Sequence, residues 1–170
     1  MNNTYHSNEL FQLYHGDSLE LLKSIPNESV DMIFADPPYF LSNGGFSVQS
    51  GKRVSVDKGE WDKSKGFAED FHFMSQWIAE SKRILKKNGT IWISGTYHSI
   101  YTCGYALLMH EFKILNDISW FKPNGAPNLS GRFFTASHEN LIWAKPYLKE
   151  KHTFNYSAMK EGEWPSDTLK

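Results

Sequence analysis

The sequence predicts an α/β protein in which strands and helices alternate around a largely parallel sheet. Three observations lead to this fold class: a continuous apolar run at 30–35, helical apolar periodicity over 67–87, and a second apolar run at 90–94. A strand–helix–strand order of this kind is the signature of an α/β sheet. Chemistry in such sheets sits just beyond the carboxyl ends of the strands, so we expect the segment after residue 35 to be functional.

The first elements can be placed from local signals. A strand is expected at Phe11–Tyr14, ending at Gly16. A short helix follows, capped by Asp17 or Ser18. Its apolar residues are Leu19, Leu21, Leu22 and Ile25. The next strand is expected at Val30–Ala35, where all residues after Asp31 are apolar. A continuous apolar run of this kind indicates a strand buried on both faces of a parallel sheet.

The rest of the chain continues the alternation. The polar stretch Ser42–Lys65 is expected to be a mobile loop without secondary structure, which favours a functional loop. After it we expect a helix that stops at Asn88-Gly89, a strand, a second helix and two further strands, at Phe67–Lys87, Thr90–Ser94, Ser99–Phe112, Ile114–Phe121 and Glu139–Ala144. The last twenty residues predict no clear element.

Single residues outside these motifs are expected to be structural. The tryptophans of the apolar segments are predicted to lie in the core, namely Trp61, Trp77, Trp92, Trp120 and Trp143. Cys103 is predicted to be a small buried group on a helix. His98 and His138 are lone histidines that we expect to be structural or on the surface.

The composition suits one folded domain of 170 residues, with 40% hydrophobic and 15% aromatic residues. Its 18 basic and 19 acidic residues nearly cancel, which excludes a disordered chain and argues against a generic polyanion binder. No apolar run approaches the ~18–20 residues that cross a bilayer. Cys103 is the single cysteine, and no Cys or His pair has zinc spacing. We expect a cytoplasmic protein without a membrane anchor or a metal site.

The strongest chemical signal is Asp36-Pro37-Pro38-Tyr39, directly after the first apolar run. Two prolines fix the backbone and remove two N–H donors, so the local surface offers mainly acceptors, the Asp36 carboxylate among them. The adjacent aromatic ring offers a stacking face. Acceptors beside a stacking ring suit a planar group that bears an amino function, such as an adenine turned out of a duplex. Alone, the tetrapeptide is equally consistent with a stiff turn, but its place after a buried strand favours function.

This tetrapeptide resembles motif IV of amino-methyltransferases, in which a first-place Asp is typical of the adenine-N6 group and Ser of the cytosine-N4 group. Further stretches that extend the resemblance are Asp31–Gly45, Ser55–Asp62, Trp92–Gly95 and Ala126–Ser130. They resemble the second adenine methyltransferase of bacterial restriction–modification systems of the DpnII type, which act on GATC and can use single-stranded DNA. The likeness extends to about Pro146.

The resemblance implies a Rossmann-like, S-adenosylmethionine-dependent methyltransferase fold that methylates N6 of a flipped adenine. Asp36 and the carbonyl of Pro37 would accept hydrogen bonds from the adenine amino group, with Pro38 completing the rigid turn and Tyr39 stacking on the base. Asp17 and Ser18 match the family's acidic loop, which lies near the cofactor. Asp36 would also lie near the cofactor. A plain helix N-cap is the alternative for these two residues.

DNA is the implied partner, together with a restriction endonuclease of the same system that need not touch this chain. Lys52 and Arg53 lie in the loop over cofactor and substrate, where they could contact phosphate. Asn124, Asn128 and Arg132 lie in the region that leads toward target recognition and have side chains suited to base edges. For all five, a solvated polar loop is the alternative.

The sequence departs from the family in one respect. Members with this motif order carry the glycine-rich cofactor segment Asp-Pro-Phe-x-Gly-x-Gly-Thr-Thr downstream of motif IV, and the sequence lacks it. We therefore expect an incomplete fold without two central strands. Residues 1–146 would be the catalytic-motif part of the methyltransferase domain, and 147–170 a polar tail leading toward the missing segments. The first strand would lose its neighbours, and the motif IV strand would have an apolar edge, so this chain alone is expected to be poorly stable and inactive.

Two other functions stay open from the sequence. The missing glycine-rich segment favours a non-catalytic nucleic-acid-binding or partner fragment that needs a complementing chain. The second alternative keeps the enzyme class and changes the acceptor to cytosine N4.

Overall fold

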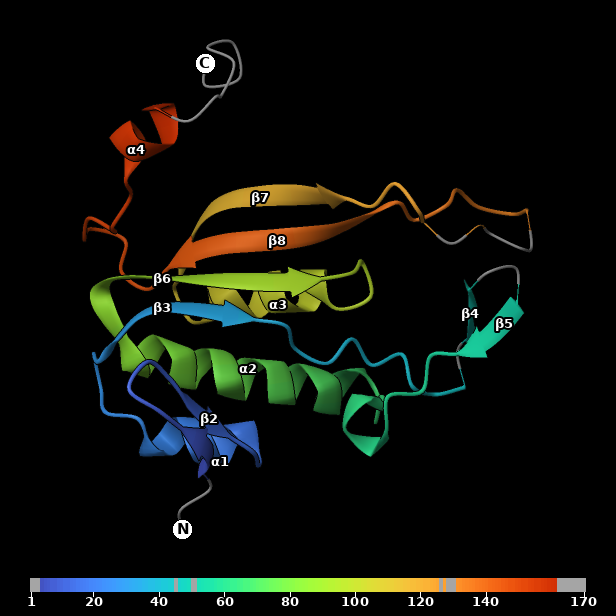
Figure 1. The fold of residues 1–170 in the computed structure, drawn as a ribbon, viewed down its shortest axis with the longest axis horizontal. Helices are drawn as coiled ribbons and strands as arrows, with labels where there is room; N and C mark the ends of the chain where they lie inside the picture. Colours follow the sequence, from blue (N-terminus) through green and yellow to red (C-terminus); the bar gives the residue numbers. More distant parts are fainter. Residues whose placement is uncertain (1–3, 45, 50–51, 126, 128–130, 162–170) are drawn as a thin grey trace.

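A four-stranded mixed sheet forms the centre of the computed structural model, which describes residues 4–44, 46–49, 52–125, 127 and 131–161 (Figure 1). The strand order is β3 (Val30–Ala35), β6 (Leu85–Gly95), β8 (His138–Lys145) and β7 (Lys113–Phe121). β3 and β6 run parallel, whereas β8 is antiparallel to both of its neighbours. The α/β class predicted from the sequence is confirmed.

Two helices, α2 (Phe67–Ile84) and α3 (Ile100–Met109), pack on one face of this sheet and form the core with it (Figure 1). Alternate residues of β6 point at the helices, because successive side chains of a strand face opposite sides. The buried side chains of this core include Met74, Trp77, Ile78, Ile91, Ile93, Cys103, Ala106, Leu107, Ile142 and Ala144. Each large apolar side chain buried in this way stabilises the fold by about 1.5–3 kcal/mol.

The predicted end of α2 is wrong by three residues, since the helix ends at Ile84 and β6 begins at once with Leu85. The backbone is crowded at Gly89, where a Cβ would lie 3.0 Å from the carbonyl oxygens of Asp31 and Lys86. The register of β3 against β6 shifts in the same region. Asn88-Gly89 is therefore an irregularity inside a strand and not a helix stop.

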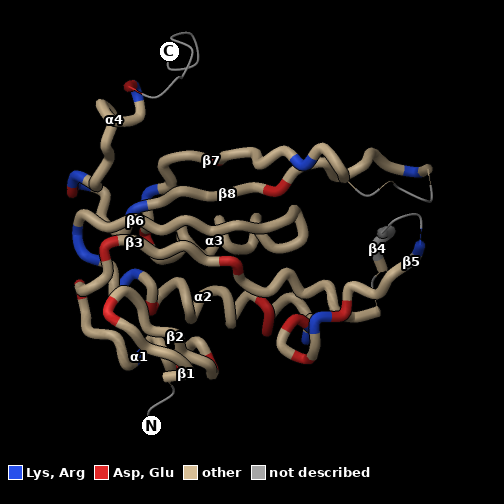
Figure 2. Tube along the Cα trace, viewed as in Figure 1, with Lys and Arg blue, Asp and Glu red and all other residues tan. Residues whose placement is uncertain are grey.

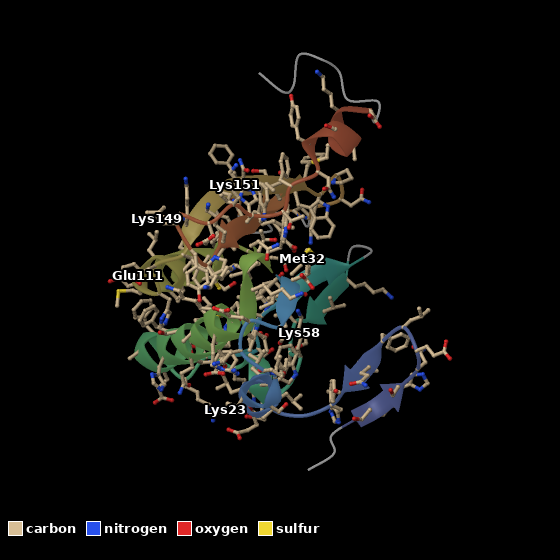
Figure 3. The ribbon with its side chains drawn as sticks, turned by 90° about the vertical axis from the view of Figure 1, so that its left-hand side faces the viewer. Lys23, Met32, Lys58, Glu111, Lys149 and Lys151 are labelled. Carbon is tan, nitrogen blue, oxygen red and sulfur yellow. The ribbon has the colours of Figure 1, made fainter. Side chains whose placement is uncertain are left out.

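The opposite face of the sheet is less covered. Trp92 and Trp143 stack there with ring centroids 4.9 Å apart. On β3, Met32, labelled in Figure 3, and Phe34 are 58% and 59% exposed. The prediction that this strand is buried on both faces is wrong, because in the described residues β3 pairs with β6 alone and its outer edge carries no strand. The unpaired apolar edge expected from the sequence is present in this part of the chain.

The N-terminal elements form a separate layer beneath α2 (Figure 1). β2 (Gln12–Tyr14) was expected to lack neighbours, yet it pairs antiparallel with β1 (Thr4–Ser7). α1 (Ser18–Ser24) packs on α2. Arg83 of α2 fixes its end, since the guanidinium donates to the carbonyls of Leu22 at 2.8 Å and Ile25 at 2.9 Å. The Leu22 carbonyl also accepts from the N–H of Ile25 at 3.0 Å. A cation near the carbonyls at a helix C-terminus is a favourable arrangement.

Two segments predicted to lack structure contain it. The Ser42–Lys65 stretch holds an antiparallel hairpin, β4 (Phe46–Gln49) with β5 (Lys52–Ser55), and a 3₁₀ turn, η1 (Glu60–Asp62). The C-terminal tail holds the short helix α4 (Tyr156–Glu161). The two ends of the loop are joined by a pair of hydrogen bonds that a local pattern does not reveal. The Asn43 side-chain amide donates to the Ser64 carbonyl at 3.0 Å, and the Ser64 N–H donates to Asn43 Oδ1 at 2.8 Å.

The prediction that five tryptophans lie in the core holds for some of them and fails for others. Trp77 and Trp143 are buried and Trp92 is half-buried. Trp61 and Trp120 are 60% and 53% exposed, so their prediction as core residues is wrong. Trp120 lies on β7, the last strand of the sheet, and Trp61 lies on η1, outside it.

The remaining predictions for single residues are confirmed. Cys103 is fully buried, and this burial raises the pKa of its thiol to about 12, so it stays neutral. His98 and His138 are exposed. None of the helices in the described ranges is long and apolar enough to cross a membrane.

Gly89→Ala is expected to lower the free energy of unfolding by about 1–3 kcal/mol, the usual cost of overpacking, because its Cβ would press on two backbone carbonyls. Gly104→Ala is the matched control, because its Cβ would meet only Ile142 Cδ1 at 3.4 Å. There the helix gains about 1 kcal/mol from replacing glycine. Urea unfolding of the two variants measures the difference, and equal stabilities would contradict the close approach at Gly89.

Candidate functional site

Asp36 lies directly after β3, at the carboxyl ends of the two parallel strands β3 and β6. One oxygen, Oδ1, accepts a hydrogen bond from Ser94 Oγ of β6 at 2.7 Å and another from the Tyr39 hydroxyl at 2.7 Å. Within the described residues Oδ2 accepts no hydrogen bond, and Asp36 is exposed. The site therefore offers one fixed carboxylate with one oxygen available to a ligand.

Tyr39 is half-buried, and its ring is held at two points. Burial raises the pKa of its phenol well above the ordinary value of 10, and the hydrogen bond to Asp36 raises it further. The hydroxyl therefore stays protonated at neutral pH and remains a donor to Asp36. The Lys58 ammonium lies 5.1 Å from the ring centroid, in a cation–π contact.

Pro37 and Pro38 border a hollow of about 270 Å³ between β3, α1 and α2. Its other walls are mainly apolar and include Ile33, Phe73 and Trp77. Neither proline donates a backbone hydrogen bond, so this rim of the site presents only acceptors. The structure thus brings Asp36, Pro37, Pro38 and Tyr39 together as the sequence predicts.

Asp17 and Ser18 lie at the start of α1, beside a second hollow of about 610 Å³. Asp17 Oδ1 accepts from the N–H groups of Leu19 at 2.9 Å and Glu20 at 3.1 Å, so the helix-cap interpretation is confirmed. Gly16, Phe40 and the exposed Trp61 also line this hollow. Ser18 and Pro38 line both hollows, which makes the two spaces neighbours.

Several residues of the site were assigned no role from the sequence. Ser94 could have been found, because it ends the strand next to β3 and so lies at the same carboxyl edge. Asp62 is buried and accepts hydrogen bonds from the N–H groups of Tyr39 and Phe40. No local pattern could have indicated this contact, since the partners are 22 and 23 residues apart in the chain.

The predicted DNA-contacting residues lie on two connections that extend beyond the carboxyl ends of β3 and β6 (Figure 1). Lys52 begins β5 and is exposed, and Arg53 follows it in the same strand, with its side chain outside the described part. Asn124 and Arg132 are exposed on the connection between β7 and β8, whereas Asn128 lies outside the described residues. Figure 2 shows acidic and basic residues interspersed along the described part of the chain.

No three His, Cys, Asp or Glu side chains of the described residues are grouped so that they could hold a metal ion.

Comparison with known proteins places this geometry in a family. The family model "DNA methylase" matches residues 30–169. The chain is 54% identical over 162 residues to the Type II methyltransferase M2.LlaDCHI of Lactococcus lactis subsp. cremoris. It is 52% identical over 162 residues to M2.DpnII of Streptococcus pneumoniae. Each match covers 95% of this chain and 60% of the relative, so the chain spans about 60% of the length of these relatives.

Solved structures share the fold. The PvuII DNA methyltransferase, which is cytosine-N4-specific, aligns with a TM-score of 0.65 at 18% identity over 91% of this chain and 55% of that one. The Thermus thermophilus protein TTHA0409, complexed with S-adenosyl-L-methionine, aligns with a TM-score of 0.57 at 17% identity over 91% of this chain and 60% of that one. Both likenesses confirm the Rossmann-like methyltransferase fold. Because the family model covers most of the chain, including the sheet and the Asp36–Tyr39 turn, this protein belongs to the DNA methylase family.

Proposed function

We propose that this chain carries the catalytic turn of a DNA methyltransferase that transfers a methyl group from S-adenosylmethionine to N6 of an adenine. The observation that carries the proposal is the Asp36 carboxylate, held at Oδ1 by Ser94 and Tyr39 with Oδ2 left for a ligand. The chain spans about 60% of its methyltransferase relatives, which is why activity, substrate and cofactor are proposed for it here.

The chemistry follows from the acceptors of the turn. The exocyclic nitrogen of adenine is a poor nucleophile because its lone pair is conjugated with the ring. Asp36 Oδ2 and the Pro37 carbonyl accept hydrogen bonds from the two amino protons, which turns the lone pair out of conjugation. When the carbon–nitrogen bond forms, the bond from the methyl carbon to the cofactor sulfonium would break and S-adenosylhomocysteine would leave. The positively charged amino group would then lose one proton to Asp36 or to water. Pro38 keeps the Pro37 carbonyl in place by restricting the backbone.

Tyr39 gives the flipped base a stacking surface. Base–aromatic stacking contributes about 1–3 kcal/mol and tolerates any base. The hydroxyl is locked on Asp36 at 2.7 Å, so the ring and the carboxylate keep a fixed relation. Because burial keeps the phenol pKa high, this donor is unchanged at physiological pH.

The residues around the larger hollow fit the cofactor that the proposal needs. S-adenosylmethionine supplies an electrophilic methyl group when it is bound. The hollow of about 610 Å³ combines aromatic walls, Phe40 and Trp61, with the Asp17 carboxylate. Asp17 Oδ1 caps α1, and Oδ2 makes no hydrogen bond in the described residues, so it can accept from an amino group of the cofactor purine. Ser18 and Asp36 would complete the contacts, since both border the adjoining hollow.

Adenine is the favoured acceptor because Asp stands first in the turn, as is typical of the adenine group. GATC as target, tolerance of single-stranded DNA, an associated restriction endonuclease and a cytoplasmic location are proposed from the likeness to DpnII-type relatives. Cytosine N4 is the alternative acceptor. A partner fragment that needs a complementing chain is the alternative class, favoured by the exposed Met32 and Phe34 on the unpaired β3 edge.

Transfer of labelled methyl groups to a GATC-containing single-stranded oligonucleotide tests this function. The assay uses the 170-residue chain alone and with the remaining C-terminal part of M2.DpnII added in trans. We expect label in N6-methyladenine, and a fall of about 10²–10³-fold with Asp36→Ala, the usual effect of losing one positioned polar group. Asp31→Ala is the matched control, because Asp31 is an exposed carboxylate of β3 paired only with Lys86.

The outcomes separate the alternatives. Label in N4-methylcytosine would contradict the adenine assignment. Label that appears only with the C-terminal part in trans would favour the fragment that needs a complementing chain. Absence of label under both conditions would contradict the enzyme. Equal losses in the Asp36 and Asp31 variants would contradict the role of the free carboxylate oxygen.

The DNA contacts are tested by salt dependence. Lys52→Gln and Arg132→Gln are each expected to lower affinity for a single-stranded oligonucleotide. Lys52→Gln would also reduce the slope of log K against log salt by about 0.7 to 1, because one phosphate contact is lost. Arg132→Gln would instead weaken binding mainly to the target sequence, because its guanidinium suits a base edge. Lys23→Gln is the control, since Lys23 (Figure 3) is exposed on α1 and paired with Glu20. Fluorescence anisotropy at several salt concentrations measures the slope, and parallel lines for Lys52→Gln and the control would contradict the phosphate contact.

A further inference from the structure

Asp62 accepts more hydrogen bonds than any other carboxylate in the described part of the chain, although its side chain is only 1% exposed. Its Oδ1 accepts from the N–H groups of Tyr39 at 2.8 Å and Phe40 at 3.0 Å. Its Oδ2 accepts from the Ser42 hydroxyl at 2.7 Å and the Leu41 N–H at 3.4 Å. Three successive backbone N–H groups around one anion form the concave arrangement known as a nest.

The charge of Asp62 is compensated by these donors alone. The described residues include no salt bridge to Asp62, and an uncompensated buried carboxylate would be costly. Burial by itself raises the pKa of Asp62. Hydrogen bonds from Ser42 and from the backbone of Tyr39 to Leu41 outweigh this effect and hold the pKa below the ordinary value of 3.8. The group is therefore an anion at neutral pH, built into the fold.

The turn that Asp62 holds is conformationally unfavourable. Phe40 has φ +57°, in the left-handed region that aromatic residues rarely adopt. Such a residue costs on the order of 1–3 kcal/mol and persists only where its surroundings determine it. Two contacts do so here: its N–H is held by Asp62, and its ring packs edge-on against Phe73 at 6.4 Å.

We propose that Asp62 is a positioning residue for the methyl transfer proposed above, on which this role rests. It fixes the backbone of Tyr39 while the hydroxyl of the same residue is fixed on Asp36. The ring that would stack on the base is thus held from both ends. Asp62 touches neither base nor cofactor in this role and acts through Tyr39.

The same carboxylate connects Tyr39 to the hairpin loop. Ser42 donates to Asp62 and accepts from the N–H of Lys58 at 2.8 Å. The Lys58 ammonium in turn lies over the Tyr39 ring. The stretch that follows β5 is therefore tied to the catalytic turn through one buried anion, and loss of that anion frees both the ring and the residue above it.

Asp62→Asn tests the proposal, because the amide keeps the size of the side chain and removes one acceptor oxygen and the charge. We expect kcat to fall by about 30- to 100-fold with KM for the oligonucleotide changed by less than about threefold, the pattern of lost orientation. A readout independent of activity is amide hydrogen exchange at Tyr39, Phe40 and Leu41, whose N–H groups Asp62 accepts. In Asp62→Asn these amides should exchange faster, while amides of the buried strand β6 keep their rates. Asp57→Asn is the matched control, because Asp57 is exposed in the same loop and accepts from the N–H of Gly59.

Ser42→Ala is the milder second variant, since it removes one donor to Asp62 and leaves the three N–H groups. It is expected to speed exchange of the same amides by a smaller amount, and it applies if Asp62→Asn does not fold. A folded Asp62→Asn with exchange at Tyr39 to Leu41 unchanged and kcat within about twofold of the original would overturn the proposal. Absence of methyl transfer in every protein would contradict the proposed function, while the amide exchange would still decide whether Asp62 holds the turn.

The acid behaviour gives an independent check on the Asp62 carboxylate. A lowered pKa in the folded state means that the stabilisation is complete above the ordinary pKa and is lost as the pH falls through the folded-state value. The difference in free energy of unfolding between the original chain and Asp62→Asn should therefore be constant above about pH 5. It should narrow as the pH falls below the ordinary value of 3.8 and through the lowered pKa of the folded state. A difference that does not narrow on acidification would overturn the assignment of the charge.

Discussion

The parallel pairing of β3 with β6 is the constraint on which the rest of the structure depends. It aligns Ala35 with Ile93, so the next residues, Asp36 and Ser94, meet at the same edge and form a hydrogen bond of 2.7 Å. Parallel neighbours require a long crossover, and here that crossover holds both the Asp36–Tyr39 turn and α2. The helix buries β6 from one side, while the turn emerges at the carboxyl edge where chemistry is placed in α/β sheets.

Two carboxylates hold Tyr39 at different atoms, since Asp62 accepts from its backbone N–H and Asp36 accepts from its hydroxyl. Asp62 is buried with both oxygens occupied by donors, so it contributes structure and has no acceptor left for a ligand. Asp36 is exposed with one oxygen fixed and one available, so it is oriented and can still accept from a ligand. The number of donors around each carboxylate thus separates a residue that supports the fold from one that can meet a ligand.

Local patterns predicted what local physics determines. The Val30–Ala35 strand and the Asp17 cap depend on neighbouring residues and were found from the sequence. The end of α2 was missed because Lys86 and Lys87 are good helix formers, and only the passage of β3 beside Gly89 forces extended backbone there. An apolar run also does not reveal how many faces of its strand are covered, and this is why the exposure of Met32 and Phe34 on β3 was missed.

The candidate site was predictable to the extent that it is contiguous in sequence. Its second layer is made by contacts between distant segments: Ser94 lies 58 residues from Asp36, and Asp62 lies 23 from Tyr39. Each segment is held by different forces, since Ser94 belongs to the packed sheet, Tyr39 to the loop around Asp62, and Asp17 to a helix fixed by Arg83. Pro38 lies where the two hollows meet. Because the supports are separate, a change in one of them should move one wall of the site and leave the others in place, so single substitutions can assign each wall its own role.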